Sequence, residues 1–103
     1  MSGPAQLSDS PGVIGARLKL LCKSMGVSQT VIAEHLGVSL STWHGYEKGR
    51  RSPNSEHARR ISKTFGVPTD WIWFGHEAFL PLHLHEKLQA AASLPDKRIR
   101  RRA

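Results

Sequence analysis

The sequence contains a single cysteine, Cys22, and no long apolar run. One cysteine excludes an internal disulfide and cannot supply a cysteine-rich zinc site, so we expect a reducing compartment. No stretch approaches the roughly 20 apolar residues that span a bilayer, and the first residues lack the basic-then-apolar order of a secretory signal. These absences favour a cytoplasmic protein.

Motifs that carry enzyme chemistry are also missing. The sequence has no glycine-rich phosphate loop and no nucleophile motif, and most of its scattered Ser and Asp residues can be assigned to helix caps. Six histidines are present, but no pair of them has the i, i+4 spacing of a helical zinc site together with a supporting third ligand. We therefore expect a protein that is not an enzyme and that holds no metal or other cofactor.

Acidic residues are few, with 8 Asp and Glu against 15 Lys and Arg, and the formal net charge is +7. This excess points to a polyanionic partner, and nucleic acid is favoured over a membrane surface because no strongly apolar helix accompanies the charge. Five of the basic residues and one acidic residue lie in the last eight positions, 96–103. This basic tail either follows phosphates as a disordered arm or only aids solubility, and both interpretations stay open.

A chain of 103 residues is long enough for one compact domain with flexible ends. Residues 1–12 are rich in Ser, Gly and Pro and carry one aliphatic side chain, so we predict a flexible N-terminal arm there. From residue 13 onward the apolar residues recur at helical spacing, and no strand pattern is found. The pattern predicts an all-α protein in which residues 76–95 form a C-terminal helical extension.

Caps and breakers divide this helical region into six predicted segments. They are a first helix from Val13 that stops at Gly26, a second capped by Ser28 that ends at Gly37, a third capped by Ser39 and closed by Gly49, a fourth capped by Ser55 and ended by Gly66, a short fifth opened by Thr69 or Asp70 and ended by Gly75, and a last one from Pro81 to Leu94.

The most informative stretch runs from Ser28 to Lys48. Two short helices joined by Gly37-Val38-Ser39 would make a tight corner, at which Ala33 lets the helices approach and Gly37 can adopt a positive φ. The pattern S-Q-x-x-x-A-x-x-x-G-V-S, followed by W-x-x-Y-E-K-G-x-R-x-P and F-G-V-P-x-D-W-I, resembles the phage Cro/cI repressor-type (XRE-like) helix-turn-helix family. The resemblance covers about residues 14–75.

The resemblance implies a compact five-helix lambda-repressor-like DNA-binding domain over residues 13–75, with an additional C-terminal helix and disordered ends. It also implies a sequence-specific regulator of transcription, a repressor of phage or bacterial type, whose helix 39–48 enters the major groove of double-stranded DNA. One domain of this size makes few base contacts, so we expect a homodimer on a pseudo-palindromic operator.

The resemblance further assigns DNA contacts by position. Leu40 can touch a thymine methyl group, Ser41 can donate or accept, and His44 can donate to a purine acceptor. The competing interpretation of these positions is an ordinary polar surface with one stray leucine. The expected base-reading residues are Leu40, Ser41, His44 and Gly45, and the expected phosphate-binding residues are Ser28, Gln29, Ser39, Thr42, Lys48, Arg50 and Arg51.

Two positions depart from the family pattern. Gly45 stands where a long polar side chain is often found. Cys22 stands where many relatives carry an arginine that pairs with the glutamate corresponding to Glu47, so Glu47 needs another partner, such as Arg17 or a backbone donor. We predict that Cys22 is a small buried hydrophobe.

The aromatic residues are interpreted mainly as core. Trp43 and Tyr46 align with core positions of the family, and two of the three residues Trp71, Trp73 and Phe74 could fill the core while the third faces a partner.

The sequence leaves open which residues contact a second copy of the chain or another protein. The Leu84 and Leu88 segment or the tryptophan-rich fifth helix could form a dimer interface, or their apolar residues could be buried within one protomer. The alternative function is an antitoxin-like protein-interaction module of the same fold, in which residues 76–95 bind a protein partner.

Overall fold

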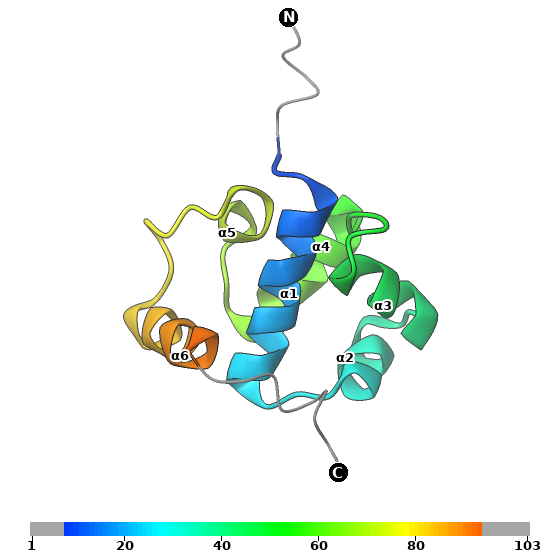
Figure 1. The fold of residues 1–103 in the computed structure, drawn as a ribbon, viewed down its shortest axis with the longest axis horizontal. Helices are drawn as coiled ribbons and strands as arrows, with labels where there is room; N and C mark the ends of the chain where they lie inside the picture. Colours follow the sequence, from blue (N-terminus) through cyan, green and yellow to red (C-terminus); the bar gives the residue numbers. More distant parts are fainter. Residues whose placement is uncertain (1–7, 94–103) are drawn as a thin grey trace, which may run out of the picture.

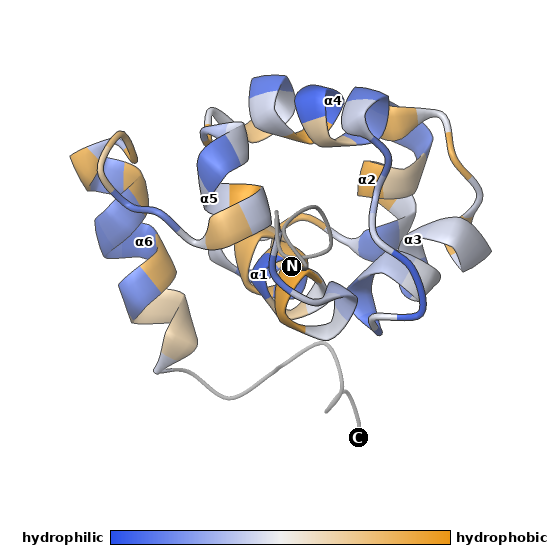
Figure 2. Cartoon of the chain, turned by 90° about the horizontal axis from the view of Figure 1, so that it is seen from above, coloured by the Kyte–Doolittle hydropathy of each residue, from blue (hydrophilic) through white to orange (hydrophobic). Residues whose placement is uncertain are grey.

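The computed structural model describes residues 8–93, which form six α-helices and no β-strand. In two views, α1 runs through the centre of the molecule, with α2 and α3 on one side and α5 and α6 on the other (Figures 1 and 2). The all-α fold predicted from the sequence is therefore confirmed. The helices are α1 (Pro11–Met25), α2 (Gln29–Leu36), α3 (Leu40–Glu47), α4 (Ser55–Phe65), α5 (Thr69–Phe74) and α6 (Leu82–Ala92).

The core forms around α1, whose apolar residues face the other helices. Ile14, Leu18 and Cys22 are completely buried, and the apolar faces of the surrounding helices turn toward them (Figure 2). Trp43 is completely buried and Tyr46 nearly so. The predictions of Cys22 as a buried hydrophobe and of Trp43 and Tyr46 as core residues are confirmed. Across residues 8–93, no helix has the length and apolar content needed to cross a membrane.

Side-chain caps and left-handed glycines set most helix ends as predicted. Ser28 Oγ accepts a hydrogen bond from the backbone N–H of Val31 at 3.2 Å, and Ser39 Oγ accepts one from that of Thr42 at 3.0 Å. Such a bond satisfies one of the N–H groups that the first helical turn leaves without an intrahelical partner. At the other end of α2, Gly37 has φ of +74°, which lets the chain turn directly into the next cap.

The N-terminal boundary differs from the prediction. Helix α1 begins at Pro11, with Ser10 as its N-cap, so residues 11 and 12 are helical rather than part of a flexible arm. Asp9 anchors the preceding turn, because its N–H donates to the carbonyl oxygen of Trp73 at 2.9 Å and its carboxylate pairs with Arg17. Residues 1–7 of the predicted arm and the basic tail 96–103 lie outside the described residues.

Two later helix starts also differ, those of α4 and α6, whereas α5 begins at Thr69 as predicted. The N-cap of α4 is Asn54 rather than Ser55, because the Asn54 side-chain oxygen accepts from the N–H of His57 at 2.8 Å. Pro68 occupies the N-cap of α5 and Pro81 that of α6, each without a side-chain hydrogen bond. A proline at the cap fixes φ near the value that the chain needs there.

One face of helix α6 is buried within its own protomer. Leu84, Leu88 and Ala91 are each at most 5% exposed, and α6 packs against α1. Of the two interpretations of this segment, burial inside one protomer is confirmed for Leu84 and Leu88. The neighbouring Phe79 and Leu82 remain 81% and 71% exposed.

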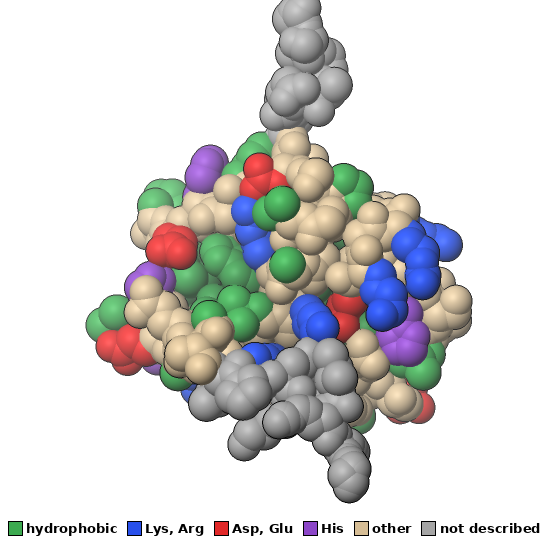
Figure 3. Space-filling view, in the orientation of Figure 1, with side chains coloured by type: hydrophobic (Ala, Val, Ile, Leu, Met, Phe, Trp, Pro, Cys, Tyr) green, Lys and Arg blue, Asp and Glu red, His purple; other side chains and the backbone are tan. Residues whose placement is uncertain are grey.

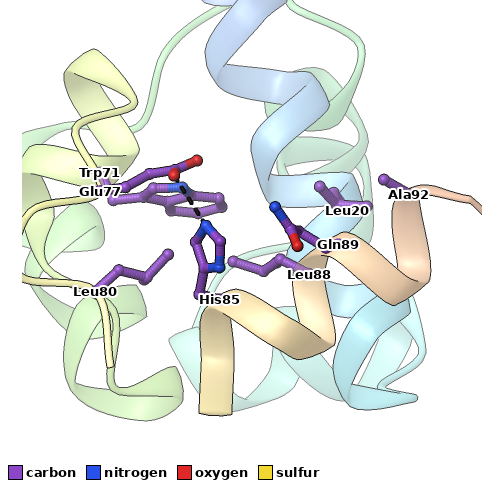
Figure 4. Close-up of a pocket in the computed structure, with 8 residues that line it drawn as sticks. All are labelled: Leu20, Trp71, Glu77, Leu80, His85, Leu88, Gln89 and Ala92. Atoms are coloured by element: carbon purple, nitrogen blue, oxygen red, sulfur yellow. Dashed lines mark hydrogen bonds and ion pairs between the residues drawn. The ribbon is translucent and has the colours of Figure 1, made fainter. Parts of the chain in front are cut away.

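Two aromatic residues of the tryptophan-rich helix α5 pack in or against the core and the third lies at the surface, as expected. Trp71 is 5% exposed and Trp73 packs against the core, whereas Phe74 is 37% exposed and stacks on His76. Trp71 also lines a pocket of about 200 Å³ between α1, α5 and α6 (Figure 4). In this pocket, His85 Nε2 lies 3.0 Å from Glu77 Oε1.

The contact between α1 and α3 requires a glycine at position 15. A Cβ built on Gly15 would lie 2.6 Å from the carbonyl oxygen of Glu47 and closer still to that of Tyr46. Both neighbours are backbone atoms, which cannot rotate away as a side chain can. Helix α1 therefore approaches the last turn of α3 as closely as its backbone permits.

We predict that Gly15→Ala lowers the free energy of unfolding by about 2 kcal/mol or more, because the added methyl group overpacks a contact between two backbones. Gly12→Ala is the matched control in the same helix, since nothing lies within 4 Å of a Cβ at that position. It should be neutral or stabilise by roughly 0.5 kcal/mol through helix propensity. Urea denaturation measures both, and equal effects of the two substitutions would contradict the close contact.

Candidate nucleic-acid interface

Helices α2 and α3 meet at a tight corner. The Val38 N–H donates to the carbonyl oxygen of Ala33 at 3.0 Å, which closes the C-terminal end of α2 while Ser39 starts α3. Ala33 is 3% exposed. Because Trp43 and Tyr46 hold the inner face of α3 in the core, the opposite face of this short helix is turned outward. The corner thus presents one helix face on a rigid support.

Most of the residues assigned to DNA contacts lie on or beside this outer face. Lys and Arg side chains gather over α3 and the loop that follows it, next to a histidine (Figure 3). Leu40 is 40% exposed. Ser28, Ser39, Leu40, Ser41, Lys48, Arg50 and Arg51 are exposed, Gln29, Thr42 and His44 are half-buried, and Gly45 is buried.

The side chains of the two N-cap serines, Ser28 and Ser39, already make hydrogen bonds within the protein. Besides capping its helix, the Ser39 hydroxyl donates to Thr42 Oγ1 at 2.9 Å, so the Thr42 hydroxyl hydrogen is directed elsewhere. The backbone N–H groups of the first turns of α2 and α3 that caps do not use point outward with the positive ends of the helix dipoles. A phosphate contact here would use these N–H groups and the hydroxyl of Thr42 or Ser28, because Ser28 Oγ only accepts in its cap.

A buried carboxylate joins α2 to α3. Glu47 is 8% exposed, and it accepts hydrogen bonds from Trp43 Nε1 at its Oε2 and from Gln29 Nε2 at its Oε1, each at 2.8 Å. The expectation that Arg17 or a backbone donor takes this place is wrong for Arg17, whose guanidinium instead pairs with Asp9 and donates to the carbonyl oxygen of Ile72 at 3.0 Å. Gln29 and Trp43 thus donate to Glu47, and Arg17 does not.

The side chain of Gln29 is therefore engaged inside the protein. Its Nε2 donates to Glu47, and its Oε1 lies 2.9 Å from Nε2 of His44. The sequence placed Gln29 at a phosphate, but it did not reveal this bridge. Gln29 is 15 positions from His44 and 18 from Glu47, and these residues come together only because the chain turns between α2 and α3. The Trp43–Glu47 pair, in contrast, has i, i+4 spacing and is recognisable from the sequence.

Gly45 is covered by an arginine rather than open to a base. A Cβ at this position would lie 3.6 Å from Nε of Arg51 and 4.0 Å from its Cγ. The side chain of Arg51 therefore lies across α3 where a long side chain at position 45 would start. The expected base-facing role of Gly45 is not supported by its burial, and Arg51 occupies that part of the surface.

Arg51 also acts on the hydroxyl of Tyr46. That oxygen lies 2.7 Å from Nδ1 of His57. Burial raises the pKa of Tyr46 above its ordinary value, and the nearby Arg51 charge opposes this by favouring the phenolate. The folded protein therefore holds the phenol proton more tightly than the unfolded chain does.

We predict that the only tyrosine of this chain titrates above its ordinary pKa of about 10 in the folded protein. Because the folded-state pKa is the higher one, this contribution to stability is complete below pH of about 10 and is lost as pH rises through the folded-state pKa. Tyrosinate absorbance measures the titration. Arg51→Ala should raise the pKa further, whereas Arg50→Ala should not, and a lowered pKa in Arg51→Ala would contradict the assignment.

Residues 8–93 contain no group of three or more His, Cys, Asp or Glu side chains that could hold a metal ion. The outer face of α3 instead offers hydroxyl, imidazole, aliphatic and cationic groups. These groups suit the base edges and phosphates of DNA.

The corner, the core and the outer face define a helix-turn-helix protein. Residues 13–71 match the family model described as a helix-turn-helix domain, and the chain belongs to that family.

Two curated proteins are similar to this chain. It is 26% identical over 84 residues to the "Cryptic phage CTXphi transcriptional repressor RstR" of Vibrio cholerae, an alignment that covers 82% of this chain and 76% of that protein. It is 33% identical over 66 residues to the "SPbeta prophage-derived uncharacterized HTH-type transcriptional regulator YonR" of Bacillus subtilis (strain 168), covering 64% of this chain and 61% of that protein. No solved structure matches the chain significantly.

Proposed function

We propose that this protein represses transcription by binding a specific DNA operator in the cytoplasm, with the helix of residues 39–48 in the major groove. It is a DNA-binding transcriptional regulator of the helix-turn-helix type. The single observation that carries the proposal is the outward face of α3, supported from behind by Trp43 and Tyr46 and flanked by exposed cations. Its chemistry is that of binding rather than of catalysis.

The exposed groups divide into two kinds. Leu40, Ser41 and His44 lie on α3 and are proposed to meet base edges, where apolar and short polar groups discriminate base pairs. Lys48 and Arg50 lie at its end and are proposed to neutralise phosphates, together with the N–H groups at the starts of α2 and α3. The first kind would set sequence preference and the second would set affinity and its salt dependence.

We further propose that the protein binds as a homodimer. One corner presents few side chains to a groove, and two copies with reading helices about 34 Å apart would double the contacts on one face of the DNA. Leu84 and Leu88 are used within the protomer, so the second copy is proposed to contact Phe79 and Leu82. These are the two most exposed large apolar side chains of the described residues.

Selection of bound sequences from a random DNA pool tests the proposed function directly. We expect a pseudo-palindrome whose half-sites are one helical turn apart. Ser41→Ala should then relax the preference at one base pair of each half-site. Lys48→Ala should weaken binding to all sequences and reduce the slope of log affinity against log salt by about 1 for each protomer. A pool without enrichment, or an operator preference that ignores both changes, would show that α3 does not read DNA.

Sedimentation of the double variant Phe79→Ser, Leu82→Ser tests the dimer. We expect wild type to sediment as a dimer and the variant as a monomer that still binds an isolated half-site, because both residues lie outside the reading corner. Ala78→Ser, at a neighbouring exposed position, is the control. A dimeric double variant would refute this interface. A monomeric wild type that binds DNA only with a second protein would favour the antitoxin-like alternative.

A further inference from the structure

A chain of hydrogen bonds runs from the core to the outer face of α3. It starts at the indole of Trp43, which donates to the buried carboxylate of Glu47 at 2.8 Å. It continues through the amide of Gln29, which lies 2.8 Å from Glu47 and 2.9 Å from His44 Nε2. Trp43 is completely buried and His44 is half-buried, so the chain connects a rigid interior to a side chain at the surface.

The direction of each bond in this chain is fixed by chemistry. An ionised carboxylate can only accept, so Glu47 requires the NH₂ group of Gln29 to face it. The carbonyl oxygen of the same amide must then face His44. A carbonyl oxygen also only accepts, so Nε2 of His44 must carry the hydrogen.

The neutral imidazole has one hydrogen on its two ring nitrogens. With Nε2 protonated and directed at Gln29, Nδ1 keeps its lone pair. No described residue makes a hydrogen bond with Nδ1 of His44, and the ring is partly accessible to solvent. His44 therefore keeps an acceptor at Nδ1, although the sequence alone suggested a donor to a purine.

We propose that Glu47, acting through Gln29, locks His44 into the tautomer that accepts at Nδ1, and that His44 thereby favours adenine or cytosine over guanine at the base that it faces in the major groove. The ligand group is N4 of cytosine or N6 of adenine, the two major-groove donors. The acceptors N7 and O6 of guanine are rejected, because they would face the His44 lone pair. Glu47 and Gln29 are positioning residues in this scheme, and the proposal rests on the proposed function of α3.

The tautomer can be measured without DNA. Long-range ¹H–¹⁵N correlation spectra of the full chain at pH about 8, well above the ordinary histidine pKa of about 6.5, report which ring nitrogen carries the hydrogen. We expect wild-type His44 to be protonated at Nε2 only. Gln29→Ala should give a mixture of tautomers, whereas Thr30→Ala, the adjacent exposed position on α2, should leave it unchanged. A wild-type ring protonated at Nδ1 would overturn the proposal.

The reading step is tested on the operator selected from the random pool. His44→Ala identifies the base pair whose preference depends on this residue. Replacing the exocyclic amine of that base by hydrogen should weaken wild-type binding roughly threefold to tenfold, the range expected for one hydrogen bond, and should leave His44→Ala unaffected. Replacing N7 of the purine by carbon should have no effect on wild type.

The outcomes separate this proposal from the proposed function. Sensitivity to the N7 replacement and not to the amine would show that His44 donates, which overturns the proposal while α3 remains the reading helix. An operator that is selected but shows no base pair dependent on His44 also overturns it. A pool that yields no operator refutes the proposed function instead.

Discussion

The end of α3 is held by two contacts that meet at Glu47, and the position of the outer face depends on both. From α1, Gly15 lies against the backbone carbonyls of Tyr46 and Glu47, so the helices touch through their main chains. From α2, Gln29 donates to the Glu47 carboxylate, which also takes the indole hydrogen of Trp43. A buried carboxylate is costly unless donors surround it, so these hydrogen bonds offset part of the cost of burying Glu47. The bond from Gln29 also joins α2 to the end of α3.

Much of this fold could be predicted from short-range chemistry. The caps at Ser28 and Ser39 and the glycine at position 37 were recognisable because each acts on residues within four positions of itself. The start of α4 was misassigned because Asn54 and Ser55 are adjacent and both can cap, and only the geometry of the preceding turn selects Asn54. The early start of α1 was missed because Asp9 is anchored by Trp73, which is distant in sequence.

The candidate site shows the same limit. The sequence predicted which positions lie on α3, since these follow from helix spacing and from the family pattern. It did not predict that Gln29 turns inward or that Arg51 covers Gly45, because both depend on how α2 and the loop after α3 pack against α3. The absence of an arginine at position 22 indicated that Glu47 needed a new partner, but spacing alone could not identify Gln29.

These two features change what the outer face can recognise. Because position 45 is a buried glycine, α3 itself offers no long side chain at its centre. The longest polar side chain at that part of the surface is Arg51, which comes from the loop after α3. Nε and Cγ of Arg51 lie close to α3 at Gly45, and an arginine whose aliphatic stem rests on a helix loses fewer rotamers when it binds a partner. The outer face of α3 thus combines a centre that is joined to the core through Glu47 with a cation whose position depends on the loop. A larger residue at position 45 would therefore change this face chiefly by displacing Arg51.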